Sequence, residues 1–316
     1  MSIRFRWLFG LLCLVTTSIP TVAQQPPDSE KMTSHASELL SRAANSSIFI
    51  YGSGVDPCAP SSPGTSLLPL GSAFVVGITD KSSSKPDSWH GWKFLVTAKH
   101  VVSNQSRVVI RLNLAREMKF KCQTLALEKA GQNQNVFLGA EGADIAAISL
   151  PDIPDTDPTV VEASLLIDAA TMKKRGIGVG TQVFTVGYIF GYSGLQANFP
   201  VTKFGQISFV TNDSWFFNSA SRLNEEGYVV QLPNAPGLSG APIFTHGIEF
   251  DVNPFRFRQL QPYVVGVMKA MLLAPVNGGV PISQGLAVIE PASNLRAAIR
   301  QIAKRLNELG KDVDVD

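Results

Sequence analysis

The stretch LPNAPGLSGAPIF, Leu232–Phe244, places Ser239 between two glycines and three residues before a proline. Glycine, proline, asparagine and serine are also the common residues of surface turns, because they adopt the backbone angles that turns require. The stretch is therefore compatible with a catalytic nucleophile and with a plain turn. The residues on either side of it have to distinguish the two.

Short apolar segments rich in Val, Ile and Phe dominate the chain around this stretch, and Gly, Pro, Asn, Asp or Ser separate them. Segments of this length and composition are typical of β-strands. They are SSIFIYG, GSAFVVGIT, KFLVTA, RVVIRLNL, DIAAISL, QVFTVGY, TKFGQISFV, GYVVQL, APIF, YVVGVMKAM and GLAVIE. The pattern predicts an all-β sandwich or barrel.

Helical periodicity is strongest at the C-terminal end, in PASNLRAAIRQIAKRLNELG, Pro291–Gly310. Apolar residues recur there every three or four positions, and Ser293 and Gly310 are placed to cap the two ends. We expect this helix to pack on the barrel, with a partner-binding helix as the alternative. A shorter amphipathic helix is expected over Asp28–Ala44.

The composition is that of a globular protein, since 45% of the 316 residues are hydrophobic and 16% are charged. Such a chain buries one large core or two modest ones. Its first 23 residues hold two arginines and no acidic residue, so without them the formal net charge falls from +2 to 2 − 2 = 0. The basic run Lys173–Arg175 is typical of a solvated turn, and we expect no nucleic-acid partner.

The N-terminus has the three parts of a secretory signal: Arg4 and Arg6, an apolar run over Trp7–Val15, and small residues up to Ala23. The apolar run has only about half the length of a membrane-spanning helix. We therefore expect cleavage after Ala23, export to the periplasm or the extracellular space, and no stable membrane insertion afterwards. A retained membrane anchor is the alternative.

Export would leave Cys58 and Cys122 in a compartment where disulfides persist. We expect the two cysteines to be bridged, with two buried free thiols as the alternative, because the sequence does not show how close their α-carbons come. The four histidines are scattered along the chain and form no short-spaced set of metal ligands. We expect neither a metal nor a cofactor.

A serine nucleophile needs a base to take its proton and an acid to orient that base. Among the histidines, His100 follows the apolar segment FLVTA, so that its ring would face a cleft at the end of a buried strand. Asp144 opens the apolar segment DIAAISL, where a carboxylate is costly unless it is hydrogen-bonded. The three residues follow one another in the order His100, Asp144, Ser239.

The segments around these residues resemble the trypsin-like serine proteases of the chymotrypsin fold, in particular short bacterial members related to the Deg proteases. The matching motifs are GSAFVV, FLVTAKHVV, GADIAAISL, VGYIFG, TKFGQIS and GLSGAPIF, and together they span Ser47–Glu290. The resemblance implies two antiparallel six-stranded β-barrels with the active site in the cleft between them, followed by a C-terminal α-helix.

The signal, the predicted helices and the resemblance together divide the chain. A signal peptide would occupy residues 1–23, and an N-terminal linker and helix would occupy residues 24–45. The first barrel, which carries the histidine and the aspartate, would span residues 46–165. The second barrel, which carries the serine, would span residues 166–290, and residues 291–316 would form the terminal helix and tail.

The implied function is that of a secreted serine endopeptidase that acts on a protein or peptide substrate through an acyl-enzyme. Ser239 would attack the peptide carbonyl, His100 would carry the proton, and Asp144 would fix the imidazole tautomer. The backbone N–H groups of Gly237 and Ser239 would hold the oxyanion. The sequence carries no indication of the oligomeric state.

Two residues depart from the pattern of this family. Leu238 stands where zymogen-activated members have an aspartate, and Ala241 replaces the usual second glycine after the serine, where its methyl group would crowd the oxyanion turn. A catalytically weak or inactive binding module on the protease fold is therefore the alternative function. An α/β-hydrolase esterase is disfavoured, because its histidine follows the serine and the acid, and Pro242 interrupts the helix that its serine should open.

The primary specificity pocket is implied to have its floor at Pro233 and its wall in GVMKAM, Gly266–Met271, with Met268 and Ala270 as lining residues. No acidic residue lies in either place. We therefore expect poor cleavage after Lys or Arg and a preference for small or medium apolar residues. Strand alternation points Lys269 to solvent, whereas an inward Lys269 would favour an acidic residue.

Overall fold

The structure is a computed structural model of the chain. It describes residues 38, 40–54, 57–58, 68–79, 91–115, 117, 119–129, 134–156, 158–190, 194, 197–210, 216–218, 223–225, 227–233, 235–246, 248–252, 255–259, 262–274 and 282–308. The expected signal peptide and most of the expected N-terminal helix lie outside these residues, although residues 40–46 are helical. The elements below all belong to one compact unit, Leu39–Asp316.

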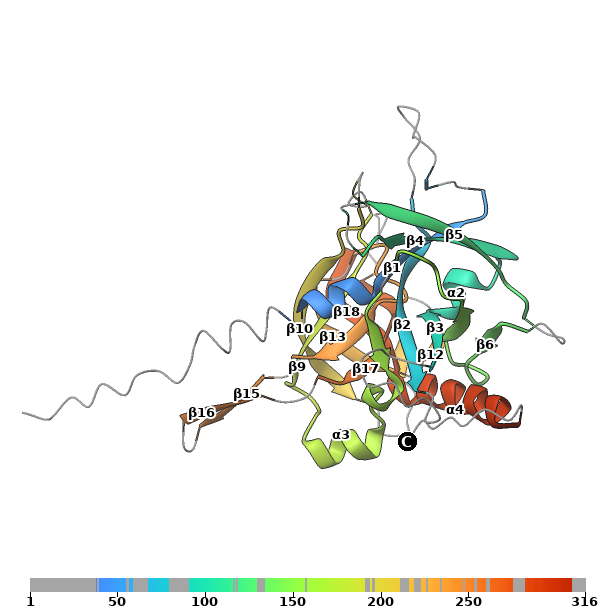
Figure 1. Cartoon of the computed structure of the whole chain (residues 1–316). Helices are drawn as coiled ribbons and strands as arrows, with labels where there is room; N and C mark the ends of the chain where they lie inside the picture. The colour runs from blue at the N-terminus through green and yellow to red at the C-terminus, as the bar shows by residue number, and fades with distance from the viewer. Residues whose placement is uncertain are drawn as a thin grey trace, which may run out of the picture. The chain divides into compact units, whose positions relative to one another are not determined.

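The N-terminal half of this unit is an eight-stranded sheet in the order β5-β4-β1-β2-β3-β7-β6, with β8 pairing in parallel with β2. Figure 1 labels all of these strands except β7 and β8. Its strands are β1 (Ser47–Gly52), β2 (Gly71–Thr79), β3 (Gly91–Thr97), β4 (Arg107–Asn113), β5 (Phe120–Ala126), β6 (Val136–Leu138), β7 (Ala146–Leu150) and β8 (Val160–Glu162). The seven strands of the main path pair antiparallel.

The C-terminal half is a closed antiparallel barrel in the order β10-β13-β18-β17-β14-β9. Its strands are β9 (Gln182–Gly187), β10 (Val201–Val210), β13 (Tyr228–Gln231), β14 (Pro242–Thr245), β17 (Val264–Ala274) and β18 (Ile282–Pro291). Two separate hairpins join β11 (Phe216–Asn218) to β12 (Leu223–Glu225) and β15 (Ile248–Val252) to β16 (Phe255–Gln259).

Strand β2 illustrates how the sequence builds two apolar layers. Its segment, GSAFVVGIT, is buried at eight of nine positions. Successive side chains of a strand point to opposite faces. Phe74 and Val76 accordingly pack in a cluster that also contains second-barrel and C-terminal residues, whereas Ala73 and Val75 pack in a cluster within the N-terminal half.

The helices are short except at the C-terminus. Besides the helical residues 40–46, they are α2 (Lys99–Val102), the 3-10 turn η1 (Ala163–Leu165), α3 (Ala169–Arg175) and α4 (Ala292–Glu308). Helix α4 buries Leu295, Ile299 and Ile302 in the cluster that both halves share, so the expected packing of this helix is confirmed. The basic run Lys173–Arg175 is exposed as expected, but it forms the last turn of α3.

The all-β class, the closed second barrel and the terminal helix are therefore confirmed. The N-terminal half differs from a six-stranded barrel, because its described strands number eight and the path ends at β5 and β6 without closing. Both end strands are poor candidates for closure: β6 has three residues, and most of β5 is only partly buried.

Candidate active site

Strands β3 and β7 bring His100 and Asp144 together. They pair antiparallel, with Thr97 opposite Ala146, so the end of β3 lies beside the start of β7. His100 Nδ1 is 2.7 Å from Asp144 Oδ2, and the backbone N–H of His100 donates to Asp144 Oδ1 at 2.9 Å. The carboxylate therefore orients the ring and leaves Nε2 for proton transfer. The ring is half exposed, whereas the Asp144 side chain is 15% exposed.

Ser239 lies in the turn between β13 and β14. The turn depends on Gly237, at φ +101°, and Gly240, at φ +88°, in the region where glycine is strongly favoured. A Cβ atom on Gly240 would lie 2.1 Å from the Ser72 carbonyl oxygen and 3.1 Å from the backbone nitrogen of Ala98. The serine turn thus packs directly on the start of β2 and on the segment that enters α2 and His100.

Ser72 holds this turn and was missed by the sequence analysis. The residue is fully buried. Its N–H donates to the Ser239 carbonyl at 2.8 Å, and its hydroxyl donates to the Gly237 carbonyl at 2.8 Å. The same hydroxyl accepts the Tyr188 N–H at 2.7 Å. A signal was present in the motif GSAFVV, where a serine begins an otherwise apolar strand.

Ser72 thus binds the carbonyl groups of both Gly237 and Ser239. The backbone N–H groups of Gly237 and Ser239 donate to no other described residue. Backbone N–H groups without a partner are the donors from which oxyanion holes are built. The Ser239 hydroxyl likewise makes no hydrogen bond to His100 within the described part of the chain, and such catalytic bonds often form only with substrate present.

The two departures from the family pattern are both core residues. Leu238 and Ala241 are fully buried and pack in the apolar cluster of the second barrel. A Cβ atom on Gly187 would lie 2.9 Å from the Ala241 methyl group. The methyl group therefore packs against β9.

A second carboxylate, Glu290, lies behind Asp144 and is only 2% exposed. Its Oε2 accepts the Asp144 N–H at 3.1 Å, and its Oε1 accepts the Asn294 amide at 2.6 Å. The Lys269 ammonium is 3.7 Å from Oε2. Burial raises the pKa of Glu290, and the hydrogen bonds and the Lys269 charge oppose that rise. Sequence reasoning missed this residue, because the segment GLAVIE reads as a plain strand.

The pairing with Glu290 corrects the expectation that Lys269 points to solvent, since its side chain is 18% exposed. The physical reason is an irregularity in the β17–β18 ladder. Met268 pairs with Ile289 and Ala270 pairs with Val288, so two residues of β17 oppose one residue of β18. Such a bulge interrupts the strict alternation on which the expectation depended.

Residues 71–249 match the Trypsin-like peptidase domain family, which is more than half of the chain. The chain belongs to this family. It therefore has the domain of the serine protease hydrolases, whereas the expected relation to the Deg proteases stays a prediction. No curated protein sequence matches the chain significantly.

Several solved structures of trypsin-like proteins resemble the fold of this peptidase-family chain. The MamO protease domain from Magnetospirillum magneticum is 12% identical, with a TM-score of 0.43 over 81% of this chain and 96% of that one. The active form of Rv3671c protease from M. tuberculosis is 15% identical, with a TM-score of 0.43 over 84% and 83%. Human heparin binding protein is 13% identical, with a TM-score of 0.45 over 82% and 92%.

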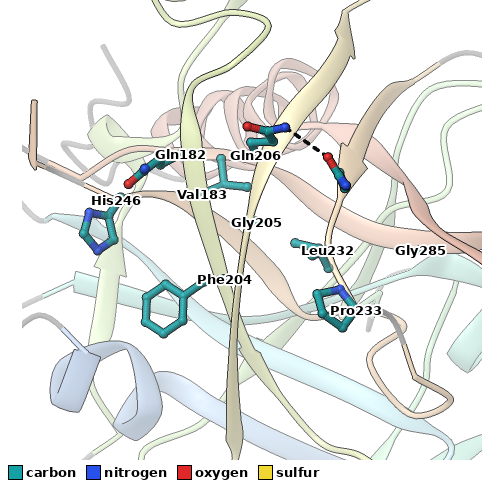
Figure 2. A pocket seen from close by; sticks show the side chains of 10 residues that line it. Gln182, Val183, Phe204, Gly205, Gln206, Leu232, Pro233, His246 and Gly285 are labelled. Atoms are coloured by element: carbon teal, nitrogen blue, oxygen red, sulfur yellow. Dashed lines mark hydrogen bonds between the residues drawn. The ribbon is translucent and has the colours of Figure 1, made fainter.

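The expected specificity residues are not gathered in the groove that Pro233 lines. Pro233 lines a groove of about 700 Å³ on the second barrel, together with Phe204 and His246 (Figure 2). Neither Met268 nor Ala270 lines this groove, and Met268 is 1% exposed in the barrel core. Ser239 and His100 are also absent from its lining. The location of the primary specificity pocket therefore stays a prediction for this family member.

Among the described residues, no three His, Cys, Asp or Glu side chains gather as metal ligands would. Within the same part of the chain, no helix has the length and apolar character needed to cross a membrane. Cys58 and Cys122 are bridged, with their α-carbons 6.0 Å apart, so the expected disulfide is confirmed.

Proposed function

We propose that this member of the trypsin-like peptidase family is a serine endopeptidase that cleaves proteins or peptides with Ser239, His100 and Asp144. The observation that carries the proposal is the double hydrogen bond of the Asp144 carboxylate to the ring and the backbone N–H of His100. A carboxylate in this position fixes the imidazole tautomer and stabilises the imidazolium that forms during proton transfer.

The proposed reaction proceeds through an acyl-enzyme. Ser239 Oγ attacks the substrate carbonyl while His100 Nε2 accepts its proton, and the N–H groups of Gly237 and Ser239 hold the oxyanion. His100 then gives the proton to the leaving amine. A water molecule, deprotonated by the same imidazole, releases the acid product and restores Ser239.

The proposed substrate preference is for small or medium apolar residues before the cleaved bond. An inward Lys269 would favour an acidic side chain if its charge were free to meet the substrate. Lys269 is instead paired with Glu290, so its charge is already balanced. Among the described residues of the site, none offers the unpaired buried anion that a Lys or Arg side chain would require.

We also propose that the protein acts after export, in the periplasm or outside the cell. The disulfide between Cys58 and Cys122 supports this location, because disulfides persist in oxidising compartments and are rare in the cytosol.

The deciding experiment is labelling with a serine-directed fluorophosphonate, followed by peptide mapping. We expect one label on Ser239 and none on the Ser239→Ala variant. Hydrolysis of a broad peptide library should fall by about 10⁶ in kcat in that variant, because the covalent route is lost. A folded wild type that takes no label and cleaves no peptide would establish the binding module in place of the enzyme.

A further inference from the structure

We propose that Glu290 is a positioning residue of this active site, which holds the Asp144 backbone so that the Asp144 carboxylate stays aimed at His100. The proposal rests on the proposed function and adds a residue from the far end of the second barrel to it. Glu290 is the second-last residue of β18, two residues before α4 begins.

The reason that Asp144 needs such support lies in the ladder between β3 and β7. The pairing begins with Thr97 and Ala146, so regular strand hydrogen bonds do not hold Asp144 itself. Its carbonyl accepts the Lys99 N–H at 3.2 Å, and its N–H donates to Glu290 Oε2 at 3.1 Å. Glu290 thus supplies the second of the two backbone anchors of Asp144.

The surroundings of Glu290 are built to hold a carboxylate in a fixed orientation. Each oxygen has its own partner: Asn294 on the first turn of α4 binds Oε1, and the Asp144 N–H binds Oε2. Lys269 on β17 supplies the cation, and Asp144 is the one anionic group among these partners. Helix α4 and strand β17 of the C-terminal half thereby fix the carboxylate, and its Oε2 accepts an N–H from Asp144 in the N-terminal half.

Stability alone does not account for this arrangement. Removing a carboxylate from water is costly, and a buried ion pair is often no more stable than apolar residues of the same volume. We attribute the presence of a carboxylate here to its Oε2 atom, which accepts the Asp144 N–H.

Two substitutions separate this role from simple packing. Glu290→Leu fills the space but removes the acceptor, and Glu290→Gln keeps an acceptor oxygen without the charge. We expect Glu290→Leu to lower kcat by about 10- to 100-fold with KM within about threefold, because a small misplacement of a catalytic group costs rates of this order. Glu290→Gln should retain about a third or more of kcat, since the bond to Asp144 is preserved.

A matched control is Glu117→Leu. Glu117 forms an exposed ion pair with Lys119 at 2.8 Å, away from the partners of Asp144. The same change of charge and volume there should leave kcat at the wild-type value, because exposed ion pairs contribute little. Equal losses in Glu117→Leu and Glu290→Leu would overturn the proposal.

The proton on His100 Nδ1 gives a readout that needs no catalysis. Its NMR signal, observed while the imidazole donates to the Asp144 carboxylate, should disappear or broaden in Glu290→Leu and persist in Glu290→Gln. An unchanged signal in Glu290→Leu would overturn the positioning role. An inactive, unlabelled wild type with the expected NMR pattern would overturn only the enzyme function and would support the positioning of Asp144.

If Glu290→Leu does not fold, Asn294→Ala decides the question. This variant removes the amide that orients the carboxylate and leaves Glu290 in place. We expect about a three- to tenfold loss of kcat and a broadened His100 signal. Wild-type kcat together with a wild-type signal in Asn294→Ala would overturn the proposal.

Discussion

At the scale of single residues, buried polar groups hold the reactive ones. Ser72 holds the serine turn by its N–H and its hydroxyl, and Glu290 holds the backbone of Asp144. Both holders are almost completely removed from solvent. Buried polar groups are costly unless they are paired, so each of these residues is expected to have a measurable effect on stability as well as on activity.

The first prediction concerns Ser72→Ala. The substitution removes the hydroxyl that donates to the Gly237 carbonyl and accepts the Tyr188 N–H, so two buried backbone groups lose this hydrogen bond. We expect the free energy of unfolding to fall by about 1–3 kcal/mol. Urea unfolding of both proteins measures this change.

The same variant should lose activity beyond its loss of stability, because the oxyanion turn is no longer held. A fall of about 10-fold or more in kcat at a temperature where both proteins are fully folded is expected. Unchanged kcat would show that the turn keeps its shape without Ser72.

The second prediction is the pH dependence of stability that Glu290 causes. Its pKa is raised in the folded state by burial, so between the unfolded and the folded pKa the folded protein binds the extra proton. The stability contribution of Glu290 is fully present below the unfolded pKa and is lost as pH rises through the folded pKa. Glu290→Gln removes this dependence.

The measurement is the difference in unfolding free energy between wild type and Glu290→Gln across the acidic range. The difference removes the contribution of Asp168, which both proteins contain. Hydrogen bonds from Thr171 lower the pKa of Asp168, so its contribution to stability changes with pH in the direction opposite to that of Glu290. We expect the unfolding free energy of Glu290→Gln to increase relative to that of the wild type as pH rises. A difference that is flat with pH would contradict the raised pKa of Glu290.

At the scale of elements, the joins between strands decide where the reactive groups lie. The antiparallel pairing of β3 with β7 brings His100 to Asp144, and the turn between β13 and β14 packs Gly240 on the start of β2. The bulge at Lys269 in β17 turns a cation toward Glu290. Strand ends, where hydrogen-bond ladders stop, supply most of the groups of the site.

The third prediction concerns the disulfide that ties β5 to the segment before β2. Cys58 and Cys122 are 64 residues apart in the chain. Closing a loop of this length is expected to stabilise the folded state by about 4 kcal/mol at most, through the entropy of the unfolded chain. Urea unfolding with and without reductant tests this, with the double variant Cys58→Ser/Cys122→Ser as a control that reductant leaves unchanged. Two titratable thiols in the unfolded, non-reduced protein would disprove the bridge.

At the scale of the whole compact unit, both halves and α4 share one apolar cluster. Phe74 of β2, Phe184 of β9 and Leu295 of α4 all belong to it. The residues of the proposed triad come from both halves, and Glu290 links them across the same boundary. The shared core therefore fixes the positions of groups on one sheet relative to groups on the other.

The fourth prediction concerns which peptide bonds the protein cleaves. We expect cleavage of a peptide library, read by mass spectrometry, to occur mainly after small or medium apolar residues. Lys269 is already paired with Glu290, and no described partner of the site offers an anion to an incoming Lys or Arg. Dominant cleavage after Lys or Arg would refute this preference.

The sequence by itself determined the all-β class, the terminal helix, the order of His100, Asp144 and Ser239, and the cysteine pair. These features follow from strand composition, helical period and local motifs, which are properties of short segments. Only the tertiary structure decided that the described strands of the N-terminal sheet do not close, that Lys269 turns inward, and that Ser72 and Glu290 hold the site. Each of these depends on contacts between residues far apart in the chain, such as the 146 positions between Asp144 and Glu290, and no local pattern encodes a partner at that distance.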